Sequence, residues 1–520
     1  MRASADTAGL RTGLATVTAG TAFLLVATVL LVAFNFVSRV VIVRSVSLGT
    51  WDAFSLGFTL TQVLLAVGGL GLPLAVARSL PFAATDDERR GILRSALTVG
   101  VASAAVAGVA LFLAAPYVGR ALGSAELGTG LAYFSVAVSA LILSTLIAAV
   151  FQGFSNVTPN ALFLQIVNPG IWLAALALAW VLPPHRITYT VALAGYAAAA
   201  TLTLAATLLY AVRVLPPSLR RGTRDPTAGT RLLHLALPLF VTAVMASVAG
   251  FGDTLVLGAF HFAEVGTYTA SLAFARLVQV GISAASYIFL PVASGFLARG
   301  DRRAVRLTYV TVTKWLTVVS LPLFVVFVFL PGSSLDLVYG SSYASVVLPL
   351  QIVVTGAFVG ALLGPAAMAQ VAAGQARLVA ANSVAAGAAD VLVSFSLVPR
   401  YGSVGAAEAW SVANVLYASL CLGELAVAER YHPFRRDFLL PLGATAIPGC
   451  ALLVLWHPHL PLWALPVVVV AFALGFSLVV PLTGSIDDGD RLLLEAVERI
   501  LGRPVPFVRR WAAIARRTVG

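Results

Sequence analysis

The sequence consists of long apolar runs separated by short segments that hold most of its charged residues. In the first 213 residues, runs without Asp, Glu, Lys or Arg are 25 to 59 residues long. About 20 apolar residues are enough for one helix to cross the hydrocarbon core of a membrane. The run of 59 residues can therefore hold two helices and the polar turn 152–160 between them. This half of the chain is predicted to contain six spanning helices.

The second half continues the pattern, although single charged residues interrupt several of its runs. It adds six further spans and then two more near the carboxyl end, so we expect an all-α integral membrane fold with about 14 transmembrane helices. The expected spans are 12–38, 53–77, 95–119, 127–185 (two), 187–212, 232–252, 265–298, 307–335, 337–376, 378–399, 403–425 and 438–486 (two).

Composition supports a membrane protein. Apolar residues make up 60% of the chain, charged residues 10%, and the mean hydropathy is +0.96, whereas charged residues are about 25% of soluble domains. A net charge of +12 would suggest nucleic acid in a soluble protein, but here the arginines lie between apolar runs, so no nucleic-acid partner is expected. Cys421 and Cys450 lie inside apolar runs, which predicts small buried residues and neither a disulfide nor a metal site.

The basic residues also predict the orientation. If the amino terminus is cytoplasmic, 26 of the 33 basic residues fall in inner segments. Four fall in outer segments, at Arg44, Arg120, Arg186 and Arg400. The other three, Arg39, Arg276 and Lys314, interrupt predicted spans. Because cytoplasmic segments are enriched in Lys and Arg, we expect a multi-pass protein of the cell (plasma) membrane with both termini in the cytoplasm.

A weak internal repeat predicts two lobes. Gly49-Thr50-Trp51 recurs as Gly266-Thr267-Tyr268, 217 positions later. The first copy is expected to form the turn between the first two spans, at Leu48-Gly49-Thr50. Transporters built from two repeats carry their substrate between the halves. The expected organisation is an amino-terminal lobe 1–213, a cytoplasmic linker 214–231, a carboxyl-terminal lobe 232–430, two extra helices within 431–482 and a cytoplasmic amphipathic tail 483–520.

One inner segment has arginines at i, i+3, i+4 and i+7, which places four cations on one face of a helix. They are Arg299, Arg302, Arg303 and Arg306. Contact with phosphate headgroups or with an anionic substrate is one interpretation. The other is that these side chains simply extend to the membrane surface from a helix end.

Several stretches resemble the polysaccharide transporters (O-antigen-type, lipid-linked oligosaccharide flippases) of the multidrug/oligosaccharidyl-lipid/polysaccharide exporter superfamily. They lie at 44–78, 235–271 and 337–343, and the closest similarity is VPRYGSVGAA at 398–407. Ser38-Arg39-Val40 is also similar to the peptidoglycan-precursor flippases of this superfamily. The resemblance implies translocation of a polyprenyl-(pyro)phosphate-linked oligosaccharide to the outer leaflet by alternating access, for surface polysaccharide or glycoprotein assembly. No bond is made or broken, so the chain is not expected to be an enzyme.

Ionisable residues within spans are the candidate functional groups, because placing a charge in mid-membrane costs about 2.5–3.5 kcal/mol. Arg39 and Arg276, one in each lobe, are candidates to bind the (pyro)phosphate, since arginine binds phosphate through two parallel hydrogen bonds. The alternative is that each pairs with a carboxylate such as Asp253 or extends to an interface. Asp390, Glu408 and Asp253 are candidates for coupling to H+ or Na+. Asp390 and Glu408 also depart from the residues usual in the resembled family. No cofactor and no metal site are expected.

Three other functions remain open. A cation-coupled multidrug exporter of the same superfamily would need acidic residues inside the first six spans, and the expected spans contain none. A membrane glycan polymerase or glycosyltransferase would need carboxylates in long outer loops, and the loops here are short. A scaffold without transport activity is the third. The expected partners are the lipid-linked glycan, membrane lipids and other glycan-assembly proteins.

Overall fold

The computed structural model describes residues 23–434, except 25, 183–185, 220–224, 298 and 344–345, and short pieces of 438–479. The described residues are almost entirely helical and contain no strand. Eleven of the described helices are long and apolar enough to cross a membrane. The chain is therefore an all-α, multi-span membrane protein, as predicted. The two expected spans of 431–482 lie largely, and the tail 483–520 entirely, outside the described residues.

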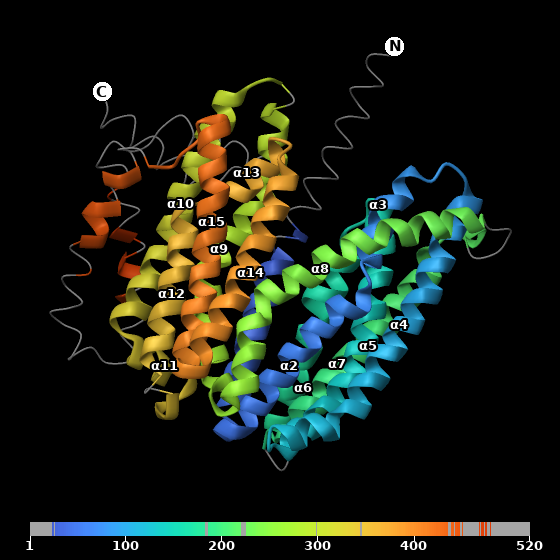
Figure 1. The fold of residues 1–520 in the computed structure, drawn as a ribbon, viewed down its shortest axis with the longest axis horizontal. Helices are drawn as coiled ribbons and strands as arrows, with labels where there is room; N and C mark the ends of the chain where they lie inside the picture. Colours follow the sequence, from blue (N-terminus) through green and yellow to red (C-terminus); the bar gives the residue numbers. More distant parts are fainter. Residues whose placement is uncertain are drawn as a thin grey trace. The chain divides into compact units, whose positions relative to one another are not determined.

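The long helices correspond to the first twelve expected spans (Figure 1). The first described span is Val26–Val43. The helices that follow, long and short, are α2 (Leu48–Gly69), α3 (Leu72–Ser79), α4 (Asp86–Ala121), α5 (Ala125–Gly153), a π-helical segment (Asn160–Val167) leading into α6 (Asn168–Val181), α7 (Tyr189–Val214), α8 (Pro226–Phe260), α9 (Val265–Leu297), α10 (Arg302–Phe329), α11 (Pro331–Tyr339), α12 (Val347–Leu362), α13 (Ala366–Ala372), α14 (Ala376–Tyr401) and α15 (Ser403–Glu429).

Packing divides the chain into two units. The amino-terminal unit comprises Ala27–Thr269 and Asp390–Ala406. The carboxyl-terminal unit comprises Met1–Val26, Ala270–Ala389 and Ala407–Gly520. Helix α8, expected at the start of the second lobe, packs against α2, α3 and α4 of the amino-terminal unit. The last six residues of the expected linker, 226–231, form the first turns of this helix.

Two local expectations were wrong. The turn before α2 lies before Leu48, because the Ser47 side chain accepts the N–H of Thr50 and thereby begins the helix. Leu48-Gly49-Thr50 is thus the first turn of α2. The second expected span is not continuous either, since Leu70 and Gly71 both adopt left-handed backbone angles and separate α2 from α3. A residue in this conformation ends an α-helix.

The amino-terminal unit is built around two buried clusters. One is aliphatic and joins α3, α4, α5 and the start of α8; its members include Leu72, Leu80, Ile92, Leu146 and Leu232. The other is aromatic and joins α2, α5, α6 and α7. In it Phe54 stacks on Trp51 and Trp172. The Phe134 ring packs edge-on against Phe54, and the Tyr196 ring packs edge-on against Phe134. These clusters fix α2 and α8 within the unit.

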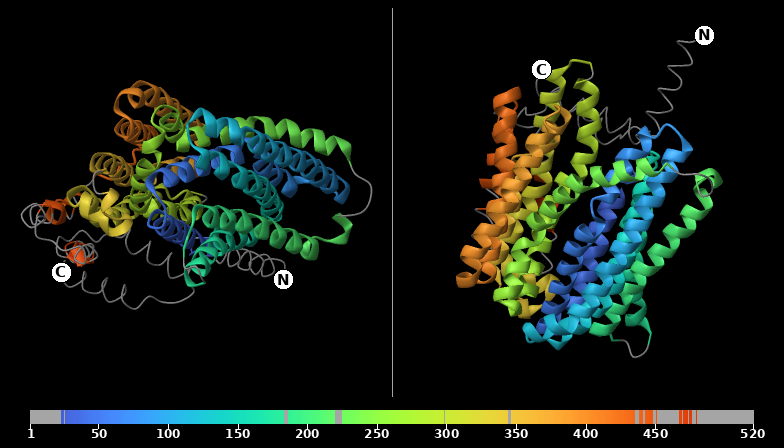
Figure 2. Two further views of the ribbon diagram at one scale, coloured as in Figure 1. Left: turned by 90° about the horizontal axis from the view of Figure 1, so that it is seen from below. Right: turned by 45° about the vertical axis from the view of Figure 1, so that its right-hand side comes forward.

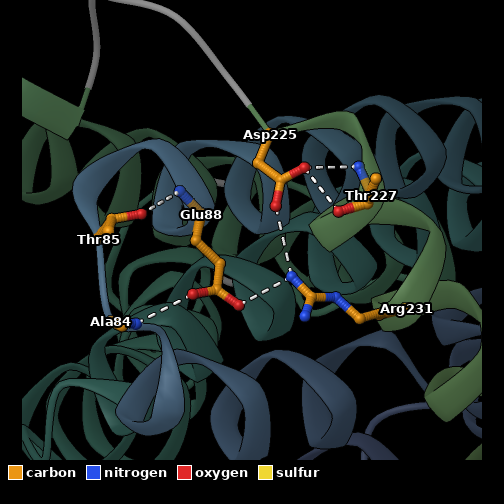
Figure 3. Close-up of polar contacts among 6 residues, drawn as sticks. All are labelled: Ala84, Thr85, Glu88, Asp225, Thr227 and Arg231. Atoms are coloured by element: carbon orange, nitrogen blue, oxygen red, sulfur yellow. Dashed lines mark hydrogen bonds and ion pairs between the residues drawn. The ribbon is translucent and has the colours of Figure 1, made fainter.

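The starts of α4 and α8 are joined by the clasp, which consists of Glu88, Arg231 and Asp225. The Arg231 guanidinium lies 2.9 Å from Glu88 Oε1 and 3.3 Å from Asp225 Oδ2, and Figure 3 shows it between the two carboxylates. Both carboxylates also hold a helix start. Glu88 accepts the N–H of Ala84, and Asp225 accepts the N–H and hydroxyl of Thr227.

Backbone contacts support the clasp. The N–H of Asp225 donates to the carbonyl of Asp87 over 3.1 Å, and the Arg90 guanidinium donates to the carbonyl of Ser218 in the linker. Two further views show the starts of α4 and α8 side by side (Figure 2). The clasp thus anchors one end of α8, the helix whose other end carries Asp253.

In the carboxyl-terminal unit, α12 and α15 approach closely. Gly356 and Gly360 lack the Cβ that would collide with Ser411 and Asn414, and the Asn414 side chain donates to the carbonyl of Gly356 over 2.8 Å. Small residues at these two positions let the α12 and α15 backbones approach closely, as they do between membrane helices in general. A buried cluster in the same unit, which includes Phe289, Tyr309 and Leu425, joins α9, α10 and α15.

Candidate functional site: a buried carboxylate pair and an arginine of the first span

Asp253 and Asp390 are 137 positions apart in sequence and meet in the interior of the amino-terminal unit. Asp253 lies near the end of α8 and Asp390 in α14, and both side chains are fully buried. The N–H of Asp253 donates to Asp390 Oδ2 over 3.3 Å. A Cβ at the adjacent Gly252 would lie 3.1 Å from the same oxygen, so this glycine leaves room for the Asp390 carboxylate.

The two carboxylates have different surroundings. Asp253 Oδ1 accepts the N–H of Thr254, over 2.7 Å, and its hydroxyl, while Tyr268 donates its hydroxyl to Asp253 Oδ2. In contrast, Asp390 Oδ1 is buried and has no hydrogen-bond partner among the described residues. The Ser394 hydroxyl, one helical turn later, is also buried and has no hydrogen-bond partner within the described part of the chain.

Nearly all buried polar groups in proteins are hydrogen-bonded, to protein or to water, so these two oxygens are able to accept a further partner. Two carboxylates this close also repel each other when both are ionised. A proton or a monovalent cation at Asp390 answers both needs, since either compensates negative charge and engages carboxylate and hydroxyl oxygens. Among the described residues no group of three His, Cys, Asp or Glu side chains is arranged to hold a metal ion.

Arg39, in the first span, lies against the aromatic cluster of the same unit. Its guanidinium carbon is 5.2 Å from the centre of the Phe58 ring, and Phe58 packs edge-on against Tyr196 at 5.7 Å. The side chain is half-buried. Stacking on an aromatic face holds a cation in place, and a guanidinium group suits the geometry of phosphate oxygens. This geometry is compatible with a phosphate contact.

The other predicted site residues belong to the carboxyl-terminal unit. Arg276 is exposed on α9, and Glu408 is half-buried on α15. Lys314, which interrupts a predicted span, is 2% exposed within α10. Of the three predicted coupling carboxylates, the structure brings together Asp253 and Asp390, and Glu408 belongs to the other unit. A phosphate clamp shared by Arg39 and Arg276 stays a prediction.

The four arginines expected on one helical face are divided. Asp301 caps the start of α10 through a hydrogen bond from the N–H of Ala304, so the helix begins at Arg302. Arg302, Arg303 and Arg306 belong to its first two turns, whereas Arg299 lies in the preceding turn. The expectation of a single helix face was therefore wrong for Arg299. Arg302 also pairs with Glu429 at 3.0 Å.

The two copies of the internal repeat contact each other, which sequence reasoning missed. The Trp51 indole donates to the carbonyl of Gly266 over 2.8 Å, and the N–H of Gly266 donates to Asp52 Oδ1 over 2.6 Å. Asp52 is 3% exposed and lies within α2. The expectation that the first six spans hold no internal acidic residue was thus wrong, although this carboxylate is engaged by the second repeat. The match at 49–51 and 266–268 was the available signal.

The VPRYGSVGAA motif forms the turn between α14 and α15. Gly402 adopts a left-handed conformation, and the N–H of Ser403 donates to Glu264 Oε2 over 2.7 Å. The carboxylate thereby caps the start of α15. A Cβ at Gly405 would lie 2.7 Å from the Leu397 backbone, so the motif is needed for a tight reversal directly after the segment that carries Asp390.

Comparison with known proteins places this fold. The chain matches the model of the family described as polysaccharide biosynthesis protein over residues 17–297, more than half of its length, and it belongs to that family. The resemblance inferred from the sequence motifs is confirmed. No curated protein sequence matches the chain.

Solved structures of transporters share the fold. A lipid II flippase, MurJ, in an inward closed conformation matches with a TM-score of 0.70 at 12% identity, over 88% of this chain and 98% of its own. An inward-facing multidrug resistance MATE family transporter of the MOP superfamily matches with a TM-score of 0.55 at 15% identity, over 76% of this chain and 94% of its own. A MOP superfamily transporter from Pyrococcus furiosus matches with a TM-score of 0.52 at 13% identity, over 80% of this chain and 95% of its own. The chain thus has the fold of MOP-superfamily flippases and transporters.

Proposed function

We propose that this protein moves a polyprenyl-(pyro)phosphate-linked oligosaccharide from the cytoplasmic to the outer leaflet by alternating access. The observation that carries the proposal is Arg39, a half-buried cation held over Phe58 in the first span of a polysaccharide biosynthesis family member. A charge in a span is costly and is retained for function. A lipid-linked glycan carries an anionic phosphate, and arginine suits that anion.

In this proposal Arg276 supplies the corresponding cation from the second repeat. Arg39 and Arg276 lie in different repeats, and substrates of repeat-built transporters bind where the repeats face each other. In the proposed complex each arginine contacts the phosphate, and the glycan stays in water. Arg302, Arg303 and Arg306, which start α10, contact phosphate headgroups at the cytoplasmic surface.

Asp390 is the proposed coupling group, with Asp253 as its partner. A proton or a sodium ion enters at the orphaned Asp390 oxygen, and its release accompanies the change of α8 and α14 between two arrangements. Glu408 is the alternative coupling residue. No cofactor other than the coupling ion is required.

The proposed location is the plasma membrane, with both termini in the cytoplasm. It rests on the arginine distribution, because 26 of the 33 basic residues lie in the segments on that side. Partners that assemble or attach the glycan would act on the lipid-linked product on the outer surface.

Deleting the gene and locating the lipid-linked glycan by leaflet tests the function. The proposal expects full-length lipid-linked glycan to accumulate in the cytoplasmic leaflet. A missing or truncated lipid glycan would indicate synthesis instead. Normal surface glycan combined with sensitivity to small cationic compounds would indicate a multidrug exporter.

A further inference from the structure

The amino-terminal unit has a pocket at the end where α2 and α7 begin, the opposite end from the clasp. Its volume is about 470 Å³, within the range of small-molecule sites, roughly 300–1,000 Å³. One wall is the segment between the first span and α2, with Arg44 and Ser47, together with Thr50 in the first turn of α2. The other wall combines Trp180, at the end of α6, with Arg186, in the loop before α7.

The residues that line the pocket carry a net positive charge. Its ten described lining residues include two arginines and no acidic residue. The nearby Glu126 accepts the Thr50 hydroxyl at 3.0 Å, and its carbonyl accepts the Tyr189 hydroxyl at 3.0 Å. These contacts tie the two walls to the start of α5 and fix the pocket's shape.

The convergence of Arg44 and Arg186 has no explanation in membrane topology. Under the orientation argued above, only four basic residues lie at the outer surface, and the positive-inside rule disfavours them there. Two of the four line this single pocket although they are 142 positions apart in sequence. Two segments that are distant in sequence thus bring two of the four outer arginines to one pocket.

Two helix starts add to the positive potential. Ser47 caps α2 and Thr188 caps α7, and both are lining residues. Long helices carry a partial positive charge at their first turns, which favours an anion. The guanidinium groups supply the planar, paired donors that fit phosphate oxygens. Trp180, whose exposed fraction is 64%, supplies an apolar face for whatever the phosphate carries.

We propose that this pocket binds the phosphate group of a phosphorylated headgroup. Arg44 and Arg186 contact the phosphate oxygens, and the Trp180 ring packs against the attached group. The phosphate belongs either to a membrane phospholipid or to a lipid-linked glycan that has reached this side. The site is separate from the intramembrane Arg39, and it does not depend on the proposed glycan translocation.

Binding of inorganic pyrophosphate tests the site directly. The full chain, in nanodiscs of phosphatidylcholine alone, is titrated by calorimetry, and the variant Arg44→Gln/Arg186→Gln is compared with wild type. Each lost charge-assisted contact weakens binding by roughly tenfold. Arg120→Gln is the matched control, because Arg120 is an exposed arginine at the same end of the unit that does not line the pocket; its affinity stays within about twofold of wild type.

A second measurement identifies the source of the phosphate. Retention of phosphatidylglycerol is measured by native mass spectrometry after extraction from mixed phosphatidylcholine–phosphatidylglycerol vesicles. If the double variant loses phosphatidylglycerol while wild type and Arg120→Gln retain it, the phosphate is that of a phospholipid headgroup. Loss of pyrophosphate binding without loss of lipid supports a lipid-linked glycan phosphate.

The proposal is overturned if wild type retains neither probe, or if the double variant and Arg120→Gln bind both probes as wild type does. Thermal unfolding of each variant checks folding. If the double variant does not fold, Arg186→Gln alone carries the comparison, because Arg186 is exposed and its replacement leaves packing unchanged. Wild-type affinity of this single variant for both probes would then overturn the site.

Discussion

The indole N–H of Trp51 donates to the carbonyl of Gly266 over 2.8 Å, and this bond joins the two copies of the internal repeat. Asp52 completes the contact by accepting the Gly266 N–H. The equivalent glycines, Gly49 and Gly266, are each the second residue of a long helix. The first is open to its surroundings, whereas the second is enclosed by the partner repeat.

Gly266→Ala is therefore expected to destabilise the protein, by about 1–3 kcal/mol. A Cβ at this position would lie 2.5 Å from Trp51 Cδ1 and 2.7 Å from Asp52 Oδ1. Gly49→Ala is the matched control, because no atom lies within 4 Å of its Cβ position and alanine favours the helix. Thermal unfolding in detergent compares the two. Equal melting temperatures would contradict the contact between the repeats.

Asp390→Asn is expected to abolish the response of transport to an ion gradient while the protein still folds. Asparagine keeps the shape of the side chain but removes the charge that a proton or sodium ion would compensate. Flipping in proteoliposomes, measured with and without a proton or a sodium gradient, tests this. Asp336→Asn, on α11 in the other unit, is the control and should keep the response. If Glu408→Gln abolishes the response and Asp390→Asn retains it, the coupling residue is Glu408.

The clasp is expected to weaken in acid. Hydrogen bonds from Thr227, and then the Arg231 guanidinium, hold the pKa of Asp225 below its usual range. A carboxyl whose pKa is lower in the folded state stabilises the fold above its ordinary pKa, and this contribution disappears as the pH falls through the folded value. The melting temperature of wild type should therefore exceed that of Asp225→Asn near neutral pH, and the difference should shrink on acidification to about pH 3.

A difference that stays constant with pH would contradict a contribution from the ionised Asp225 carboxylate to the stability of the fold. The side chain of Arg231 is 64% exposed, so Arg231→Gln should lower the melting temperature only slightly and should reduce the same pH dependence. Arg94→Gln, on α4 outside the clasp, should leave the pH dependence as in wild type.

Sequence patterning predicted the helices well because lipid imposes a simple rule on length and composition. The runs 95–119 and 187–212 correspond to α4 and α7. Sequence patterning failed where the backbone conformation determines the end of a helix. At Leu70-Gly71 two left-handed residues interrupt a continuous apolar run. Nothing in the hydrophobic pattern distinguishes this break from an uninterrupted helix.

The candidate site was predicted in part. The free-energy cost of a charge within a membrane identified Asp253 and Asp390 as separate candidates. Only the structure shows that they meet, and that Asp390 Oδ1 lacks a hydrogen-bond partner among the described residues. Arg44 and Arg186 were recognised only as exceptions to a charge rule. Their shared pocket depends on two loops far apart in sequence, which a single sequence does not relate.

Flipping by purified protein tests the central claim most directly. Lipid-linked oligosaccharide extracted from the deletion strain is placed in proteoliposomes, and its exposure on the outer surface is followed with a membrane-impermeant glycosidase. Wild type and Arg120→Gln should expose the glycan held in the inner leaflet. Arg39→Gln/Arg276→Gln should insert normally and leave that glycan protected, as empty liposomes do. Exposure by the double variant at the wild-type rate would contradict the account.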